Sequence, residues 1–207
     1  MLQFYKVFLF INYGLLISIL FFIIWKYRLL CKRERQYVYY IVFLFLIELI
    51  NLFFAYVMDL DNTSFLYPYY IFGEFLLLTS LFLRKLNLPK YLLIVNSLIG
   101  ILFLLASNFL SIEINYDLAK VISNIIIICL AGFTLLQQMK SSNSKDQFYL
   151  VDASIFFYYS VSVFIFVVQS QIVNLSTESV YLLMGTNNVL STLLYCSIVY
   201  TLLKLKK

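Results

Sequence analysis

Long apolar runs, separated by short polar segments, make up most of this chain. A helix rises about 1.5 Å per residue, so about 20 apolar residues cross a hydrocarbon core of roughly 30 Å. Seven runs approach or reach this length, and they cover approximately residues 7–25, 37–57, 68–83, 91–110, 118–139, 148–172 and 180–203. Pro68 and Pro89 stand where the third and fourth runs begin, and proline breaks no helical hydrogen bond there. The pattern predicts an all-α, polytopic membrane protein, a single seven-transmembrane-helix bundle over residues 1–207.

The composition supports the same fold class. Hydrophobic residues make up 63% of the 207 residues and charged residues only 12%, whereas soluble domains average about 45–50% apolar and about 25% charged. A water-soluble fold of this size cannot bury so much apolar surface. The lipid bilayer is therefore an expected partner, and the expected location is a cell membrane, the inner membrane in a Gram-negative cell. Nothing in the sequence indicates nucleic-acid binding.

The basic residues predict the orientation, because cytoplasmic connections carry an excess of Lys and Arg. Alternating connections place 13 of the 15 basic residues on one side: Lys26, Arg28, Lys32, Arg33, Arg35, Arg84, Lys85, Lys90, Lys140, Lys145, Lys204, Lys206 and Lys207. The other side holds Lys6 and Lys120 and most of the acidic residues outside the runs. We therefore expect the N-terminus outside and the C-terminus inside.

The connections are short, at most about a dozen residues, so we expect any cytoplasmic output to come from a partner protein. The densest basic segment on the predicted inner side contains Lys32, Arg33 and Arg35. Such a segment mainly indicates which side of the membrane it lies on, but it also attracts anionic lipid or an acidic partner. We interpret these three residues as a candidate contact for lipid or for another membrane or cytoplasmic protein.

The absence of histidine narrows the chemistry. It excludes imidazole-ligated metals and Ser-His or Cys-His nucleophiles. The last run has no lysine before Lys204, so it cannot form the Schiff base of a retinal protein. We expect no cofactor and no metal. The sequence does not indicate an enzyme, although proton transfer by Glu48 and Glu74 stays chemically open.

Polar residues inside the apolar runs define a candidate ligand site, because a polar group that faces lipid costs several kcal/mol. Those of interest are Asn12, Glu48, Asn51, Tyr70, Glu74, Asn124, Gln169, Asn187 and Asn188. Their positions along alternating spans place them in the outer half of the bilayer or near its midplane. They predict a polar cavity that opens outward, walled by helices one, two, three, five, six and seven, with room for a small molecule or a cation.

A structural interpretation competes with this site. Asn and Gln also join membrane helices by hydrogen bonds that contribute about 0.6–2 kcal/mol each. Glu48 and Glu74 are harder to explain in this way, since a buried carboxylate is either neutral or paired. We expect no Lys or Arg at their depth. A shared proton or a bound cation would then be needed to neutralise the two carboxylates. Asp152 is expected near the inner boundary, in contact with the helix dipole and interfacial water.

Three stretches carry a family resemblance: residues 47–51 (IELIN), 69–75 (YYIFGEF) and 148–159 (FYLVDASIFFYY). In this order they resemble the pattern of uncharacterised small seven-helix membrane proteins of Bacteroidota. In architecture alone, the chain is also similar to the membrane sensor regions of bacterial histidine kinases, but it has no kinase domain. The resemblance implies a receptor-like module that works with a partner, and it implies no substrate.

These observations favour a non-enzymatic receptor or sensor-like membrane module with an outward-facing polar pocket that acts through a partner protein. Two alternatives stay open. Buried carboxylates also carry ions in transporters and in proton- or cation-coupled exchangers. The chain could equally be a structural subunit of a membrane complex.

Overall fold

The computed structural model describes residues 1–31, 34–60, 62–109, 116–140, 146–171 and 176–205. Within these residues each predicted apolar run corresponds to one α-helix. The helices are α1 (Leu2–Lys26), α2 (Arg35–Tyr56), α3 (Tyr67–Lys85), α4 (Lys90–Phe109), α5 (Tyr116–Lys140), α6 (Tyr149–Gln171) and α7 (Thr177–Lys204). Two 3-10 helices, η1 (Tyr27–Leu29) and η2 (Ser64–Leu66), precede α2 and α3. The expected boundaries are correct to within a few residues, and the all-α fold class is confirmed.

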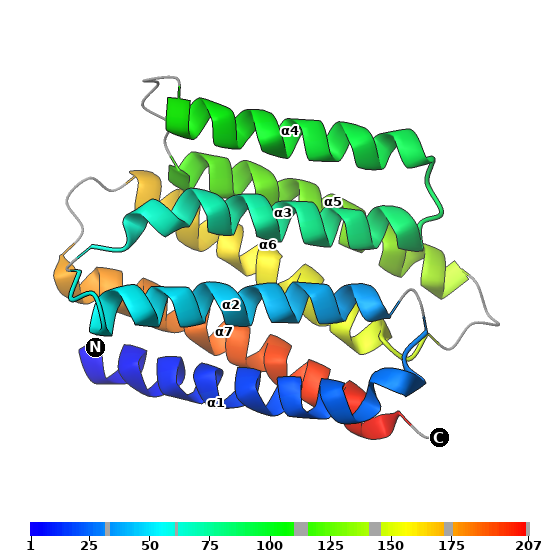
Figure 1. Cartoon of the computed structure of the whole chain (residues 1–207), viewed down its shortest axis with the longest axis horizontal. Coiled ribbons are helices and arrows are strands. Elements are labelled where there is room, and N and C mark those ends of the chain that lie inside the picture. The colour runs from blue at the N-terminus through cyan, green and yellow to red at the C-terminus, as the bar shows by residue number, and fades with distance from the viewer. Residues whose placement is uncertain (32–33, 61, 110–115, 141–145, 172–175, 206–207) are drawn as a thin grey trace.

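Six of these helices form a closed ring, and α4 lies outside it. Around the ring α1 contacts α2, α2 contacts α3, α3 contacts α5, α5 contacts α6, α6 contacts α7, and α7 returns to α1. Helix α4 packs against α3 at the edge of the bundle (Figure 1). The six helices of the ring are the six that the sequence predicted around a cavity.

The helices run along the long axis of the molecule, and the beginning of α1 and the end of α7 lie at opposite ends (Figure 1). We call the end where α1 begins the N-side and the end where α7 finishes the C-side. Lys26 fixes α1 to α7 at the C-side, since its Nζ donates to the carbonyl oxygens of Leu203 (3.0 Å) and Leu205 (2.9 Å). These bonds satisfy carbonyls at the helix C-terminus that have no partner within the helix.

Local chemistry explains where several helices begin and how two of them approach. Pro68 lies in the first turn of α3, and the hydroxyl of Ser176 accepts a hydrogen bond from the Ser179 N–H at the start of α7. Helices α2 and α3 come close at Gly73, where a Cβ atom would collide with the ring of Phe43. Glu74, the next residue in α3, is buried inside the ring of helices.

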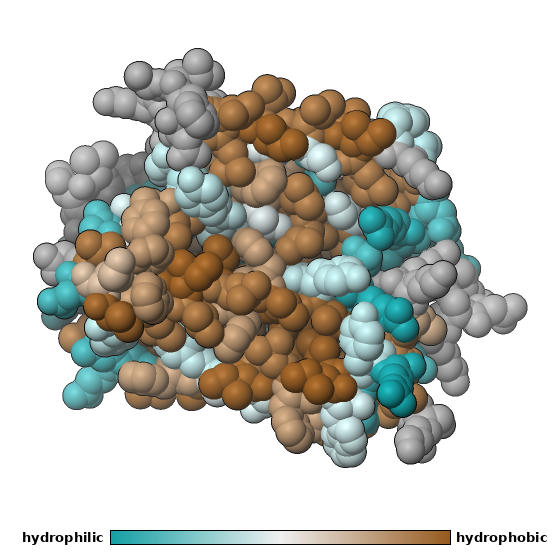
Figure 2. All heavy atoms as spheres, in the orientation of Figure 1, coloured by the Kyte–Doolittle hydropathy of each residue, from teal (hydrophilic) through white to brown (hydrophobic). Residues whose placement is uncertain are grey.

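Apolar side chains fill the interior and also cover the outside of the bundle. Leu78, Phe82, Ile127 and Ile155 are fully buried within the ring. Figure 2 shows hydrophobic residues over the middle of the visible face, with hydrophilic residues gathered toward the two ends. Six helices in the described part of the chain are long and apolar enough to cross a membrane, and α4 is apolar over the described residues 91–105. These are the features of a membrane protein.

Candidate functional site

A polar cavity of about 100 Å³ lies inside the ring, between α1, α2, α3, α6 and α7. Six of the nine predicted site residues line it: Asn12, Glu48, Tyr70, Glu74, Asn187 and Asn188. They come from four helices, so the structure brings together residues that are up to 176 positions apart in the sequence. Tyrosines that the sequence analysis did not select, among them Tyr40 and Tyr195, complete much of the wall.

The other three predicted residues do not belong to the lining of this cavity. Asn51 and Gln169 are partly buried on α2 and α6. Asn124 on α5 is fully buried, and neither atom of its amide has a hydrogen-bond partner among the described residues. Helix α5 therefore supplies no wall of the cavity, and the expectation that it would do so is wrong.

Glu74 forms an ion pair with Lys120 of α5 at the edge of this cavity. Both side chains are only 1% exposed, and the carboxylate and the ammonium group are in direct contact. Glu74 Oε1 also accepts hydrogen bonds from the hydroxyls of Tyr70 (2.8 Å) and Tyr159 (2.6 Å). The Tyr159 hydroxyl in turn lies 3.1 Å from the Tyr40 hydroxyl of α2. These contacts connect Glu74 of α3 directly to α5 and α6, and to α2 through Tyr159.

This pair overturns two expectations. Lys120 does not lie at the bilayer surface, and a lysine does reach the depth of Glu74. Lys120 has a second stabilising contact, because its Nζ lies 4.4 Å from the centroid of the Tyr70 ring. Glu74 consequently needs neither a shared proton nor a bound cation to be neutralised. One signal in the sequence could have shown this, since Lys120 precedes Asn124 by four residues and shares its helix face.

Glu48 has no such counter-ion. Its nearest described side-chain partner is the hydroxyl of Tyr13 on α1, at 3.4 Å from Oε2. Among the residues that the structure describes, no lysine or arginine forms an ion pair with this carboxylate. Glu48 lines the cavity, whereas the Glu74 charge beside it is already compensated. The cavity therefore holds one carboxylate without a cationic partner.

Amide side chains at the cavity join neighbouring helices, as the structural interpretation expects. Asn12 Nδ2 donates to the main-chain oxygen of Asn188 (3.0 Å), and the Thr192 hydroxyl donates to Asn12 Oδ1 (2.8 Å). These contacts connect α1 to α7. The Ser162 hydroxyl donates to Asn187 Oδ1 (2.6 Å) and connects α6 to α7. Asn12 and Asn187 thus hold the ring closed around the cavity that they line.

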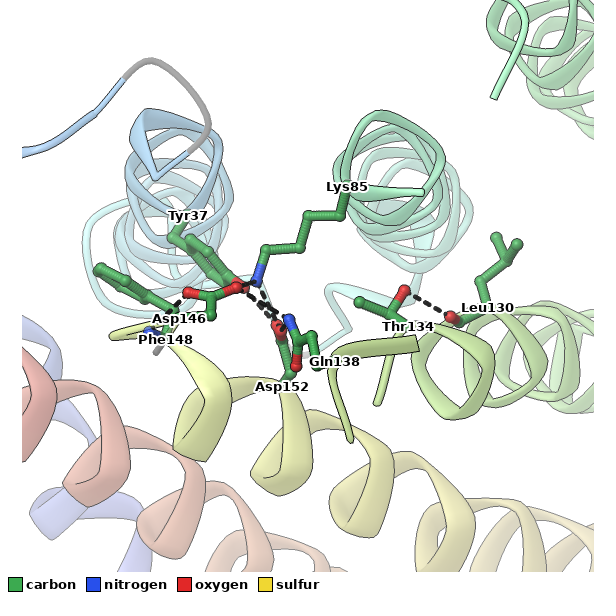
Figure 3. Close-up of polar contacts among 8 residues, drawn as sticks. All are labelled: Tyr37, Lys85, Leu130, Thr134, Gln138, Asp146, Phe148 and Asp152. Atoms are coloured by element: carbon green, nitrogen blue, oxygen red, sulfur yellow. Dashed lines mark hydrogen bonds and ion pairs between the residues drawn. The ribbon is translucent and has the colours of Figure 1, made fainter. Parts of the chain in front are cut away.

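A second charged cluster lies near the C-side, where α2, α3, α5 and α6 meet (Figure 3). Lys85 Nζ lies 2.8 Å from Asp146 Oδ2 and 2.5 Å from Asp152 Oδ2. Gln138 Nε2 donates to the same two oxygens, at 2.8 and 3.0 Å. The Tyr37 hydroxyl donates to the other oxygen of Asp152. One lysine therefore contacts both carboxylates, and every oxygen of Asp152 has a donor.

This cluster corrects the interpretation of Asp152. The residue does lie in the first turn of α6, as expected. Its side chain is 0% exposed, however, and its partners are Lys85, Gln138 and Tyr37. A fully buried carboxylate in such a network is a tertiary link between four helices, and contact with interfacial water plays no part in it.

Of the three residues of the candidate basic contact, only Arg35 lies within the described part of the chain. Lys32 and Arg33 lie outside the described residues. Arg35 begins α2, and its guanidinium lies 4.9 Å from the centroid of the Tyr27 ring in η1. Cys31, which precedes this segment, is exposed, and its N–H donates to Glu34 Oε2 at 2.7 Å.

Comparison of the chain with models of protein families, with curated protein sequences and with solved structures gives no match. The chemistry of the site therefore has to be inferred from its own geometry. Among the described residues no group of three His, Cys, Asp or Glu side chains is placed to hold a metal ion. What the cavity offers is one uncompensated carboxylate, several phenols and several amides around a space of small-molecule size.

Proposed function

We propose that this protein is a receptor-like integral membrane module that holds a small polar ligand in the cavity inside its helix ring and acts through a partner protein. The cavity opens toward the outside of the cell in this proposal, and the signal leaves through the basic segment that follows η1. No catalytic step is assigned. The proposal needs only a ligand whose binding changes how the ring helices pack.

The observation that carries this proposal is that the acids inside the bundle differ in their partners: Glu74 and Asp152 are buried, whereas Glu48 and Asp146 are partly exposed. Glu74, Asp146 and Asp152 each have a lysine within ion-pair distance. Glu48 has no lysine or arginine within ion-pair distance among the described residues, and it lines a cavity with other polar groups. An uncompensated carboxylate next to a cavity is costly in a membrane protein, and a ligand that completes it would recover that free energy.

The orientation belongs to the same proposal: seven spans including α4, with the N-terminus outside and the C-terminus inside. Burial of Lys120 removes one of the two basic residues from the predicted outer side and leaves Lys6 there, which sharpens the charge asymmetry. An impermeant maleimide, added to cells in which Cys129 and Cys196 are replaced by alanine, tests it. Asn62→Cys should react, and Cys31 should react only after the membrane is opened. Labelling of Cys31 in intact cells would contradict the orientation.

Binding is tested with the purified full chain in lipid nanodiscs, by thermal unfolding in a panel of small polar solutes. A ligand of the cavity raises the unfolding temperature, since it binds only the folded state. Ser191→Leu fills the cavity and should abolish the rise, because Ser191 lines it. Ser18→Leu is the matched control: both serines donate to a carbonyl four residues earlier, but Ser18 is exposed on α1. A rise that persists in Ser191→Leu would place the ligand elsewhere.

Signal transfer to the inner side is tested by the rate at which Cys31 is labelled. With Cys129 and Cys196 replaced by alanine, the labelling rate of Cys31 reports on the chain just before the basic segment. We expect a ligand that raises the unfolding temperature to change this rate, and the change to disappear in Ser191→Leu. An unchanged rate with a bound ligand would remove the receptor part of the proposal and leave a binding protein.

A transporter is the second candidate, because charged groups occupy two levels of the ring. The cluster around Lys85 lies closer to the C-side than the cavity does, and transporters carry such groups along their substrate path. Uptake of a bound radiolabelled solute into proteoliposomes distinguishes the two. Accumulation above that of empty liposomes favours the transporter, and binding without accumulation favours the receptor.

A further inference from the structure

The charge of the cavity indicates the charge of its ligand. The two carboxylates at the cavity, Glu48 and Glu74, are accompanied by one cation, Lys120, which contacts Glu74. The formal charge of the three groups is therefore −1, and it resides on Glu48. A ligand of one positive charge would neutralise the site, whereas an anion would meet an uncompensated carboxylate in a partly dry space.

The remaining wall suits an organic cation better than a bare metal ion. Five tyrosines line the cavity: Tyr13, Tyr40, Tyr70, Tyr158 and Tyr195. The faces of such rings attract ammonium groups, most strongly where water is excluded. Leucines complete the wall at Leu9, Leu16, Leu44 and Leu194. They offer contact to an alkyl group, which a metal ion lacks.

The volume limits the size of that cation. A cavity of about 100 Å³ has room for several water-sized groups, since about 10–15 Å³ of such space already holds one water molecule. An ammonium group with a chain of one to three carbons fits this space. The three N–H donors of a primary ammonium match the acceptors in this lining, because Glu48, Tyr13 and Asn188 all line the cavity and each has a side-chain oxygen.

We propose that the cavity binds a small primary ammonium ion, with the Glu48 carboxylate as its counter-ion. The inference rests on the proposed function and names the ligand class of that same site. The ammonium group donates to both the Glu48 carboxylate and the Tyr13 hydroxyl oxygen, and its alkyl part contacts the leucines and the tyrosine rings. The same group could belong to a free amine or to an aminoethyl lipid headgroup that reaches the cavity.

The test uses the full chain in phosphatidylcholine nanodiscs, because this lipid has no primary amine. Thermal unfolding is followed with ethylammonium chloride, with sodium chloride at equal ionic strength, and with ethanol as a neutral molecule of similar size. Ethylammonium should raise the unfolding temperature of the wild type in a saturable way, and the two controls should not. Glu48→Gln should raise the ethylammonium Kd at least tenfold. Glu178→Gln, an exposed position in the first turn of α7, should leave it unchanged.

Each other outcome has a distinct meaning. Equal shifts with sodium and ethylammonium, or an undiminished ethylammonium shift in Glu48→Gln, would overturn the amine assignment. A neutral solute of the panel that stabilises the wild type and Glu48→Gln alike, but not Ser191→Leu, would also overturn it while the ligand cavity of the proposed function stands. If no solute acts through the cavity, both proposals fail.

The source of the ammonium group is decided by repeating the measurement with phosphatidylethanolamine in the nanodiscs. Stabilisation by this lipid that depends on Glu48 and is displaced by ethylammonium assigns the headgroup as the source. If the lipid has no effect and ethylammonium still binds, the ligand is a free amine.

Discussion

The two charged clusters of this bundle contain the same groups in different arrangements. The cavity cluster consists of Glu48, Glu74 and Lys120, and the C-side cluster consists of Asp146, Asp152 and Lys85. Each has two carboxylates and one lysine. In the C-side cluster the lysine lies between both carboxylates, whereas in the cavity cluster it contacts Glu74 alone. In the C-side cluster both carboxylates contact the lysine. In the cavity cluster Glu48 does not, and it lines the cavity.

The number of partners that each carboxylate has distinguishes acids that stabilise the fold from an acid that can bind a ligand. In the C-side cluster, Gln138 and Tyr37 donate to Asp152 beside Lys85, and the Phe148 N–H donates to Asp146 Oδ1, so each carboxylate oxygen has a donor among the described residues. At the cavity, Tyr70 and Tyr159 saturate Glu74 in the same way, and Glu48 keeps a single long contact to Tyr13. Three of the four acids therefore stabilise the fold, and Glu48 is the one available for binding.

The largest effect is expected when the buried pair of the cavity cluster is broken. Lys120→Met leaves the Glu74 carboxylate uncompensated at 1% exposure, and removal of one partner of a buried pair costs about 3–5 kcal/mol. The free energy of unfolding, measured by denaturant titration in detergent, should fall by this amount. The double variant Glu74→Gln with Lys120→Met should recover most of it, and Lys6→Met, at an exposed position, should change little. A mild effect of Lys120→Met alone would contradict the pairing.

A smaller loss is expected at the C-side cluster. Lys85→Met removes the counter-ion of Asp146 and Asp152, but Asp146 is 23% exposed and Gln138 still donates to both acids. We expect about 1–3 kcal/mol, the range for buried groups left without a partner. Lys140→Met, an exposed lysine at the end of α5, is the control in the same denaturant titration. A loss larger than that of Lys120→Met would reverse the proposed order of the two clusters.

Removing a single donor should have a still smaller effect. Tyr37→Phe deletes the hydroxyl that donates to Asp152 and keeps the ring that stacks on Phe148, with centroids 4.6 Å apart. We expect a loss of about 1.5 kcal/mol, at the lower end for hydrogen bonds to charged groups. Tyr39→Phe changes the same group at an exposed position and should be neutral. Equal stabilities of the two variants would show that Asp152 does not depend on the phenol.

The smallest effect on stability is expected at Glu48, where the effect on binding is largest. Glu48→Gln removes a carboxylate that has no counter-ion, so the unfolding free energy in the absence of ligand should change by less than about 0.5 kcal/mol or rise. Glu74→Gln, by contrast, should destabilise, because it leaves Lys120 without its partner. If Glu48→Gln proved as destabilising as Glu74→Gln, Glu48 would have a structural role and the comparison between the clusters would fail.

The length and spacing of the apolar runs determined the helices and the depth of the polar residues in them. Because a membrane helix has to be apolar over about 20 residues, its boundaries can be found from local sequence. Depth follows from position along the helix, which explains why Asn12, Glu48, Glu74 and Asn187 were correctly expected at one level. Five of the six helices that this reasoning placed around a cavity line it, and α5 does not.

The pairing of charges was decided only by the tertiary structure. Lipid is as apolar as a bundle core, so hydrophobic residues do not show which face of a membrane helix turns inward. Lys120 near the start of α5 therefore suggested a surface position, and only the contact between α3 and α5 brings it to Glu74. For the same reason Tyr37 and Asp152, 115 positions apart, could not be paired from the sequence. The sequence places Glu48 and Glu74 inside the bundle, and the order of helices around the ring decides which of the two has a lysine as its partner.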